Sequence, residues 1–279
     1  MSGSWSDYVG RSEQRQDLIT ATPARALAAT LDHPPLAGTD GEAIPGLWIW
    51  LWFTPLAPMS EVGPDGHPRR GGFLPPIEAP RRMWAGSRCR FHAPLRIGDT
   101  LTRTSTITAI TEKVGRTSTL TFVTVRHAAE AGGTLIYEEE QDLVFMPIPE
   151  RFEPPPPTAP PAGDWREPLA VNPVLLFRFS ALTFNGHRIH YDRTYAVDVE
   201  KYPGLVVHGP LQAIWMFDAG LRHGGGRAPA RFEFRGLRPL FDFDSVSVGG
   251  AARADGGLDL FTASGEDAMG ARASLTFAD

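Results

Sequence analysis

A nearly continuous run of apolar residues in the second half of the chain predicts a buried helix. Over residues 209–222 the apolar pattern is broken mainly by Gln212 and Asp218. Gly209 suits the N-cap, and Pro210 suits the first helical position, where its missing N–H costs nothing. A helix that is apolar all round must be buried on all sides. We therefore expect a central helix wrapped by a sheet, with its first N–H groups pointing into a pocket.

The N-terminal part of the chain has less regular patterns. Residues 12–31 carry apolar side chains at steps of three and four, which predicts an amphipathic helix that Pro23 breaks or restarts. The Trp-rich run 47–53 is too short for its period to distinguish a buried helix from a strand; its tryptophans are expected in the core. Residues 54–82 are irregular and rich in Gly and Pro, which is typical of a binding loop or a lid.

From residue 83 onward the pattern changes to that of strands. Threonines alternate with other residues over 101–108, a turn is expected at Gly115, and 120–125 and 134–145 are rich in β-branched and aromatic residues. Residues 147–168 then carry nine prolines in 22 positions. This composition predicts an extended connector that does not pack as an element.

The order of elements repeats after the connector, with a helix followed by strands. Residues 94–101 also align faintly with 239–246, and each segment leads into a strand meander. Together these features predict two copies of one helix-plus-antiparallel-sheet unit, an α+β arrangement. We divide the chain into an N-terminal half (1–146), the connector (147–168) and a C-terminal half (169–279).

Composition narrows the class of protein. The 279 residues carry a formal net charge of −5, which argues against a general affinity for nucleic acid or anionic membranes. One cysteine, Cys89, excludes an internal disulfide and fits a reducing compartment. No secretory signal is visible, and the longest apolar run, 47–53, is far below the roughly 20 residues of a membrane helix. We expect a cytoplasmic protein.

Polar side chains are concentrated just before the predicted helix. Residues 184–192 read Phe-Asn-Gly-His-Arg-Ile-His-Tyr-Asp, which resembles a variant of the MaoC-type hydratase motif Asp-x-Asn-Pro-x-His-x-Asp. Residues 207–211 resemble the start of that family's central helix. With segments 69–76 and 81–86 of the N-terminal half, the chain is similar to the branch of 3-methylfumaryl-CoA (mesaconyl-C4-CoA) hydratases and mitochondrial-type hydroxyacyl-thioester dehydratases.

The resemblance implies a fold and an activity. The fold is a double hotdog, two antiparallel sheets each wrapped round a central helix, with an acyl-thioester tunnel between them. The activity is that of a hydro-lyase adding water to a short enoyl-CoA thioester, and the expected acyl group is branched and dicarboxylic, such as mesaconyl-C4. Coenzyme A is part of the substrate, and no other cofactor is implied.

This chain departs from the family motif at two places. Asn185 stands where the wider family has an aspartate, and His187-Arg188 stands where it has Asn-Pro. Because an amide cannot act as a base at neutral pH, the two-group mechanism of the wider family does not transfer directly. His190 is then the expected general acid–base, since an imidazole with a pKa near ~6.5 can take a proton from water and return it to a carbon.

Two further residues are expected to assist His190. Asn185 can orient water or the histidine through its amide, or it can serve only as a turn residue before Gly186. The N–H of Gly209, at the start of the buried helix, can stabilise the enolate oxygen that develops on the thioester. A plain N-cap role for Gly209 is compatible with this.

The remaining candidates are expected to bind substrate: Arg188, Arg193, His187, His208, Arg235 and Arg238. The guanidinium groups of Arg188 and Arg193 flank His190 and suit a distal carboxylate, although Arg188 can instead bind Asp192 or phosphates of coenzyme A. Arg235 and Arg238 are candidates for those phosphates. His208 is expected to act mainly through packing. Four arginines lie in the segment expected to close the pocket: Arg69, Arg70, Arg81 and Arg82.

The alternatives to this interpretation are a metal site and other activities on acyl thioesters. His187 and His190 have a spacing that could hold a metal, but no third ligand accompanies them, so no metal is expected. The open alternatives are a (3R)-hydroxyacyl-ACP or -CoA dehydratase of fatty acid metabolism, a hotdog thioesterase, and a non-catalytic acyl-thioester-binding protein. The expected partner is an acyl-CoA thioester, with a homodimer as an open alternative, and neither nucleic acid nor membrane.

Overall fold

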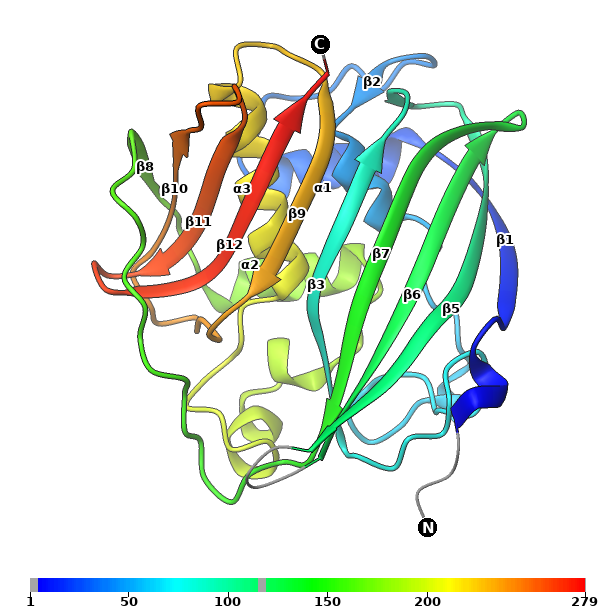
Figure 1. Ribbon diagram of the computed structural model, residues 1–279, viewed down its shortest axis with the longest axis vertical. Coiled ribbons are helices and arrows are strands. Elements are labelled where there is room, and N and C mark those ends of the chain that lie inside the picture. Colours follow the sequence, from blue (N-terminus) through cyan, green and yellow to red (C-terminus); the bar gives the residue numbers. More distant parts are fainter. Residues whose placement is uncertain (1–4, 115–118, 279) are drawn as a thin grey trace.

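The computed structural model describes residues 5–114 and 119–278. Figure 1 shows a broad, strongly curled antiparallel sheet. The first half contains η1 (Trp5–Tyr8), β1 (Ser12–Leu18), α1 (Ala21–Thr30), β2 (Ala43–Ile44), η2 (Gly46–Leu51), η3 (Met59–Glu61), β3 (Arg81–Phe91), β4 (Leu95–Arg96), β5 (Thr100–Val114), β6 (Thr119–Ala131) and β7 (Thr134–Met146). The second half contains β8 (Trp165–Pro168), α2 (Pro173–Leu182), η4 (Arg188–His190), η5 (Tyr195–Val199), α3 (Gly209–His223), β9 (Pro229–Gly236), β10 (Val246–Ala252), β11 (Leu258–Ser264) and β12 (Ala268–Phe277).

The sheet is built from two copies of the same five-strand unit. The strand order is β1-β5-β6-β7-β3 in the first half and β9-β12-β11-β10-β8 in the second, and the halves join where β3 pairs with β9. Gly86 sits at this junction, where a Cβ atom would lie 2.3 Å from the carbonyl oxygen of Phe234. The predicted repeat and the α+β class are confirmed. The two predicted sheets form one continuous sheet, because strands β3 and β9 hydrogen-bond to each other.

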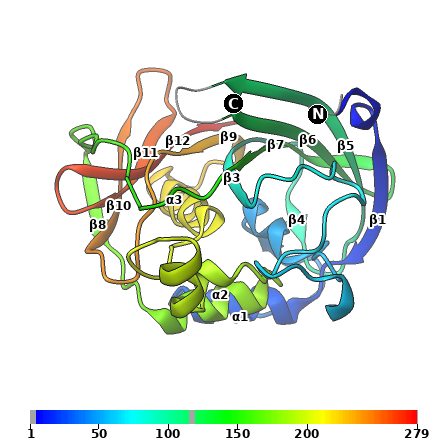
Figure 2. The same cartoon turned by 90° about the horizontal axis from the view of Figure 1, so that it is seen from below.

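Helix α3 is the central helix of the second half, as predicted. Every residue from Leu211 to Gly220 is buried, and the helix lies in the concave side of the sheet (Figure 2). A Cβ atom on Gly220 would lie 2.7 Å from the side chain of Leu275, so glycine permits the close contact of helix and sheet. The predicted N-cap is off by one residue: His208 is the N-cap and Gly209 is already helical.

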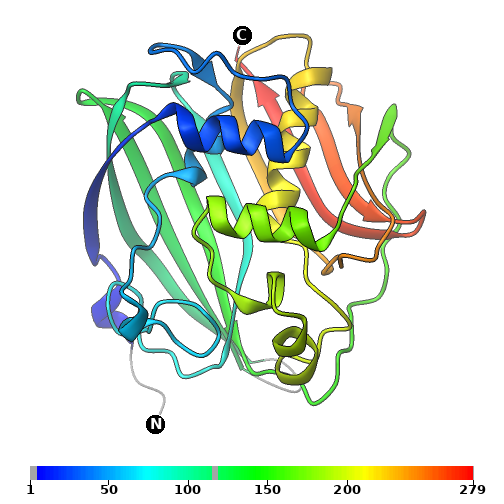
Figure 3. The same cartoon turned by 180° about the vertical axis from the view of Figure 1, so that it is seen from behind.

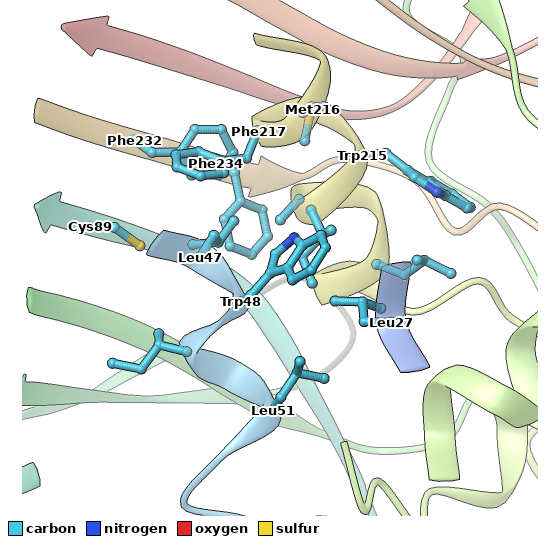
Figure 4. Close-up of a cluster of buried hydrophobic side chains, with 14 of the residues drawn as sticks. Leu27, Leu47, Trp48, Leu51, Cys89, Trp215, Met216, Phe217, Phe232 and Phe234 are labelled. Carbon is cyan, nitrogen blue, oxygen red and sulfur yellow. The ribbon is translucent and has the colours of Figure 1, made fainter. Parts of the chain in front are cut away.

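The first half has only a short helix at the corresponding place. The Trp-rich run forms η2, a six-residue 3-10 helix, instead of a long helix or a strand. Leu47, Trp48 and Leu51 are buried against α3 and the sheet (Figure 4), and the indole N–H of Trp48 donates to Asp218 at 3.1 Å. Because η2 is short, the concave face of the first half retains space for a cavity.

Helices α1 and α2 lie side by side across the open side of the curled sheet (Figure 3). The prediction of a single helix over 12–31 is wrong for its first part, because Ser12–Leu18 pairs with β5 as strand β1. Side chains of Ser12, Gln14 and Gln16 hydrogen-bond to threonines of β5, which a helical pattern cannot reveal. Pro23 lies in the first turn of α1, where proline is tolerated.

The connector packs at its end, contrary to prediction. Residues Trp165–Pro168 form β8, the edge strand beside β10, and the ring of Trp165 stacks on that of His223 at 3.9 Å. The turn predicted at Gly115 lies outside the described residues. None of the helices in the described ranges is long and apolar enough to cross a membrane.

Candidate active site

A cavity of about 1390 Å³ lies between the two halves. Its walls come from the concave face of β3, β6 and β7, from the loop after η2, from the polar residues 183–190 and from the first turn of α3. His190, His187, Asn185 and Gly209 all line it. The structure therefore brings all three predicted catalytic residues to one cavity.

The imidazole of His190 is held in one tautomer. Its Nδ1 lies 2.7 Å from the carbonyl oxygen of Val206, and since a carbonyl can only accept, Nδ1 carries the proton. Burial, together with the nearby rings of His208 and His187, holds the pKa of His190 well below its usual value. The ring is therefore neutral at pH 7, with a lone pair on Nε2 that makes no hydrogen bond within the described residues.

The ring of His208 packs against the ring of His190. The two rings stack with centroids 3.7 Å apart, and the Nε2 atom of His208 lies 2.8 Å from the hydroxyl of Ser180. Burial lowers the pKa of His208 to about 3. His208 is not among the described residues that line the cavity, and its expected contact with substrate stays a prediction. The expected packing role agrees with the structure.

His187 belongs to a buried charged cluster that sequence reasoning missed. Its Nε2 lies 2.8 Å from Oε1 of Glu200, whose other oxygen accepts a hydrogen bond from Nε of Arg81 at 3.0 Å. The guanidinium of Arg81 also lies over the ring of Tyr202. All three charged or imidazole groups are buried. Glu200 carries no local sequence signal, because a lone carboxylate between Val199 and Lys201 looks like a surface residue.

Asn185 is a turn residue whose side-chain amide nitrogen has no hydrogen-bond partner among the described residues. Its Oδ1 accepts the N–H of His187 at 3.0 Å, and its own N–H donates to the carbonyl of Ser180. The preceding Phe184 has φ of 50°, a conformation that such a turn requires. No described residue accepts a hydrogen bond from Nδ2, and Asn185 lines the cavity. The oxygen shapes the turn, and the nitrogen is available to a ligand.

The two roles of Asn185 can be separated by substitution. Asn185→Ala loses both the turn acceptor and the Nδ2 donor, so we expect a decrease of about tenfold in kcat with a smaller change in KM. Asn185→Asp keeps the acceptor, and we expect it to retain most activity. Its carboxylate should raise the pKa of the nearby imidazoles, which moves the acid limb of the pH profile upward. Steady-state kinetics from pH 5 to 9 would test this, and parental kinetics for Asn185→Ala would exclude both roles.

The first turn of α3 presents free N–H groups to the cavity. The first intrahelical donor is Gln212, whose N–H binds the carbonyl of His208, so the N–H groups of Gly209 and Leu211 precede the helical ladder. A Cβ atom on Gly209 would have the carbonyl of Trp84 at 3.7 Å as its nearest neighbour. The positive end of the helix dipole at this point favours an oxyanion.

Arg188 and Arg193 are not among the described residues that line the cavity, and their expected contact with a distal carboxylate stays a prediction. The guanidinium of Arg188 donates to Asp192 at 2.7 Å and to the carbonyl of Pro64 at 3.0 Å. Arg193 pairs with Asp242. These contacts tie the loop that contains η4 to neighbouring segments.

The structure places the other candidates near the cavity. Arg235 and Arg238 both line it, and a guanidinium N–H of Arg238 donates to the carbonyl of Pro155 in the connector. Their contact with coenzyme A phosphates stays a prediction. Among the described residues, no group of three His, Cys, Asp or Glu side chains is placed to hold a metal ion, and the expected absence of a metal also stays a prediction.

Comparison with known proteins gives consistent results. Residues 47–242 match the family described as hydroxyacyl-thioester dehydratase type 2. The chain is 50% identical over 246 residues to a mesaconyl-C(4)-CoA hydratase of Chloroflexus aurantiacus, which covers 86% of each chain. It is 29% identical over 262 residues to the mitochondrial hydroxyacyl-thioester dehydratase type 2 of Schizosaccharomyces pombe, covering 81% of this chain and 85% of that one.

Solved structures show the same fold. A MaoC-like dehydratase from Phytophthora capsici has a TM-score of 0.72 at 14% identity, with 97% of this chain and 96% of that chain covered. A Mycobacterium tuberculosis protein with a double hotdog fold has a TM-score of 0.60 at 14% identity and 96% coverage of both chains. The expected double hotdog fold is confirmed.

Proposed function

Because the chain is a hydro-lyase of the hydroxyacyl-thioester dehydratase type 2 family, we propose that it hydrates a short, branched, dicarboxylic enoyl-CoA such as mesaconyl-C4-CoA. The observation that supports this most is the neutral imidazole of His190, with its free Nε2, in the same cavity as the first turn of α3. The relative that is 50% identical carries the name of that activity.

In the proposed reaction one imidazole moves both protons. Nε2 of His190 takes a proton from water, and the resulting hydroxide adds to C3 of the enoyl group. The C2–C3 π electrons move toward the thioester, and the N–H of Gly209 stabilises the enolate oxygen. The protonated imidazole then returns its proton to C2, which completes the net addition of one water. Asn185 Nδ2 orients the attacking water.

The cofactor, the cellular compartment and the alternative activities follow from the same features. Coenzyme A enters as part of the substrate, and the chemistry above uses no other cofactor. The single buried thiol of Cys89 fits the cytoplasm. A thioesterase is less favoured, because its candidate carboxylate, Asp192, is paired with Arg188. A fatty-acyl dehydratase is the second candidate, and the relative from Schizosaccharomyces pombe supports it.

Direct incubation with a panel of thioesters tests the proposed substrate. We expect mesaconyl-C4-CoA to gain one water, as seen by mass spectrometry, with a kcat/KM at least about tenfold above that of crotonyl-CoA, since the cavity carries unbalanced positive charge. A free-thiol assay run in parallel should show no release of coenzyme A. Equal or better turnover of crotonyl- or octenoyl-CoA would favour the fatty-acyl dehydratase, and release of thiol would favour a thioesterase.

A further inference from the structure

Arg82, the second residue of β3, places a guanidinium in the cavity without a protein partner. It lines the cavity, and within the described ranges it makes no hydrogen bond or ion pair. By contrast, its neighbour Arg81, which also lines the cavity, is paired with Glu200. Arg82 is partly buried, and a partly desolvated guanidinium without a counter-charge costs stability, which a ligand of opposite charge would offset.

The strand geometry places this guanidinium next to the proposed reaction. Arg82 and Trp84 point to the same face of β3, because side chains alternate along a strand. The carbonyl of Trp84 lies beside Gly209 at the start of α3, so Arg82 is two residues, about 6.6 Å of strand, from the proposed oxyanion site. In an enoyl group with a carboxylate on C3, only three C–C bonds of about 1.5 Å separate the thioester carbonyl carbon from the carboxylate carbon.

The charges around Arg82 leave it with an unbalanced positive charge. The nearby charged groups that affect the guanidinium of Arg82 are a second guanidinium, that of Arg70, and one carboxylate, that of Asp65. Asp65 is occupied by His67, whose Nδ1 lies 3.1 Å away. Burial and the charge of Arg82 lower the pKa of His67 to about 3, so this imidazole adds no charge at neutral pH. The guanidinium N–H groups of Arg70 donate hydrogen bonds to the carbonyls of Ile77, Ala79 and Pro80.

His67, whose pKa is lowered in part by the charge of Arg82, belongs to a row of imidazoles that leads to the proposed base. The ring of His67 lies 4.4 Å from that of His187, and His187 lies 5.5 Å from His190, measured between centroids. Arg103 also lines the cavity, but β5 is three strands away from β3. At about 4.8 Å per strand this is about 14 Å across the sheet, too far for a carboxylate on a four-carbon chain held at His190.

We propose that Arg82 binds the distal carboxylate of the dicarboxylic enoyl-CoA and thereby sets the preference of the site for that substrate class. The planar guanidinium offers two parallel N–H groups to the carboxylate, and the pair is desolvated inside the cavity. This inference rests on the proposed function, because it requires a dicarboxylic substrate. It replaces Arg188 and Arg193 as the residues that recognise the carboxylate.

The test compares a carboxylate substrate with its methyl counterpart. We would measure kcat/KM for mesaconyl-C4-CoA and 3-methylcrotonyl-CoA with the parent, Arg82→Met and Arg82→Lys. Arg82→Met should lose about 100-fold on the dicarboxylic substrate, about 2.8 kcal/mol, and should not lose activity on the methyl substrate. Arg82→Lys keeps the charge without the planar pair of donors, so it should fall between the two. Arg193→Met is the matched control, since it removes an arginine near His190 that is not among the described residues that line the cavity.

The outcomes separate this inference from the proposed function. If the parent prefers the methyl substrate, the dicarboxylic substrate itself is wrong. If the parent prefers mesaconyl-C4-CoA and Arg82→Met keeps that preference, the proposed function stands and the role of Arg82 is overturned; the same holds if Arg193→Met abolishes the preference. Should Arg82→Met fail to fold, Arg82→Gln replaces it. Calorimetric binding of succinyl-CoA and butyryl-CoA adds a readout independent of turnover, with selective loss of succinyl-CoA binding expected.

Discussion

Replacing His190 with alanine is expected to leave a folded protein that binds acyl-CoA but has at least about 100-fold lower kcat. The reason is that the same Nε2 both removes the proton from water and delivers it to C2. Nδ1 of His208 is also unpaired, but His208 is not among the described residues that line the cavity. Stopped-assay kinetics with mesaconyl-C4-CoA, together with circular dichroism, would measure the effect. Retention of more than roughly a tenth of the parental kcat would remove His190 from the catalytic role.

The pH dependence of the parent provides an independent check on His190. Its pKa is held well below the usual value by burial and by neighbouring imidazoles, so the basic form persists as the pH falls. The acid limb of kcat/KM should therefore lie below about pH 6.5, the value for an unperturbed imidazole. An acid limb above that value would contradict a buried neutral base. Ser180→Ala removes the hydroxyl that hydrogen-bonds to His208 and leaves the hydrogen bond of His190 in place. The acid limb of this variant should therefore also lie below about pH 6.5.

Removal of the Glu200 side chain is expected to be the most destabilising single change in the polar part of the structure. Glu200→Ala leaves the guanidinium of Arg81 buried and unpaired and frees Nε2 of His187. Breaking a buried ion pair on one side typically costs about 3–5 kcal/mol of unfolding free energy. Urea denaturation followed by tryptophan fluorescence would measure the loss, and activity should fall with it because η4 and His190 follow His187 directly.

Two further variants make this second prediction specific. Arg222→Met removes an exposed arginine that pairs with Glu167, and its effect on unfolding should be less than a third of that of Glu200→Ala. The double variant Arg81→Met/Glu200→Leu removes both charges, so it should be more stable than Glu200→Ala alone. A loss for Glu200→Ala no larger than that for Arg222→Met would show that the cluster contributes little.

The fold was largely predictable because its signals are local. The nearly all-round apolar pattern of residues 209–222 predicted a buried helix, and the alternation around 101–108 predicted a strand, since periodicity depends only on neighbours along the chain. The prediction failed for β1 and β8. Both are edge strands whose pairing depends on side chains far away in sequence, such as the threonines of β5 and the ring of His223.

The candidate site was predictable only in part. The motif around His190 led to the cavity, and Asn185 and Gly209 followed from their positions in it. Glu200 could not have been found, because a single carboxylate has no period or spacing. The prediction for Arg188 rested on its closeness to His190 in sequence, whereas a 3-10 helix turns consecutive side chains about 120° apart.

By itself the sequence determined the central helix α3, the strand meanders, the repeat of the two halves and the histidine for which we propose the catalytic role. These depend on hydrophobic periodicity and on a short motif, which act over a few residues. Only the tertiary structure decided which arginines line the cavity and which of these lack a partner. Whether a guanidinium is free depends on partners brought together from distant segments: Glu200 binds Arg81, Asp192 and Pro64 bind Arg188, and the fold brings no partner among the described residues to Arg82.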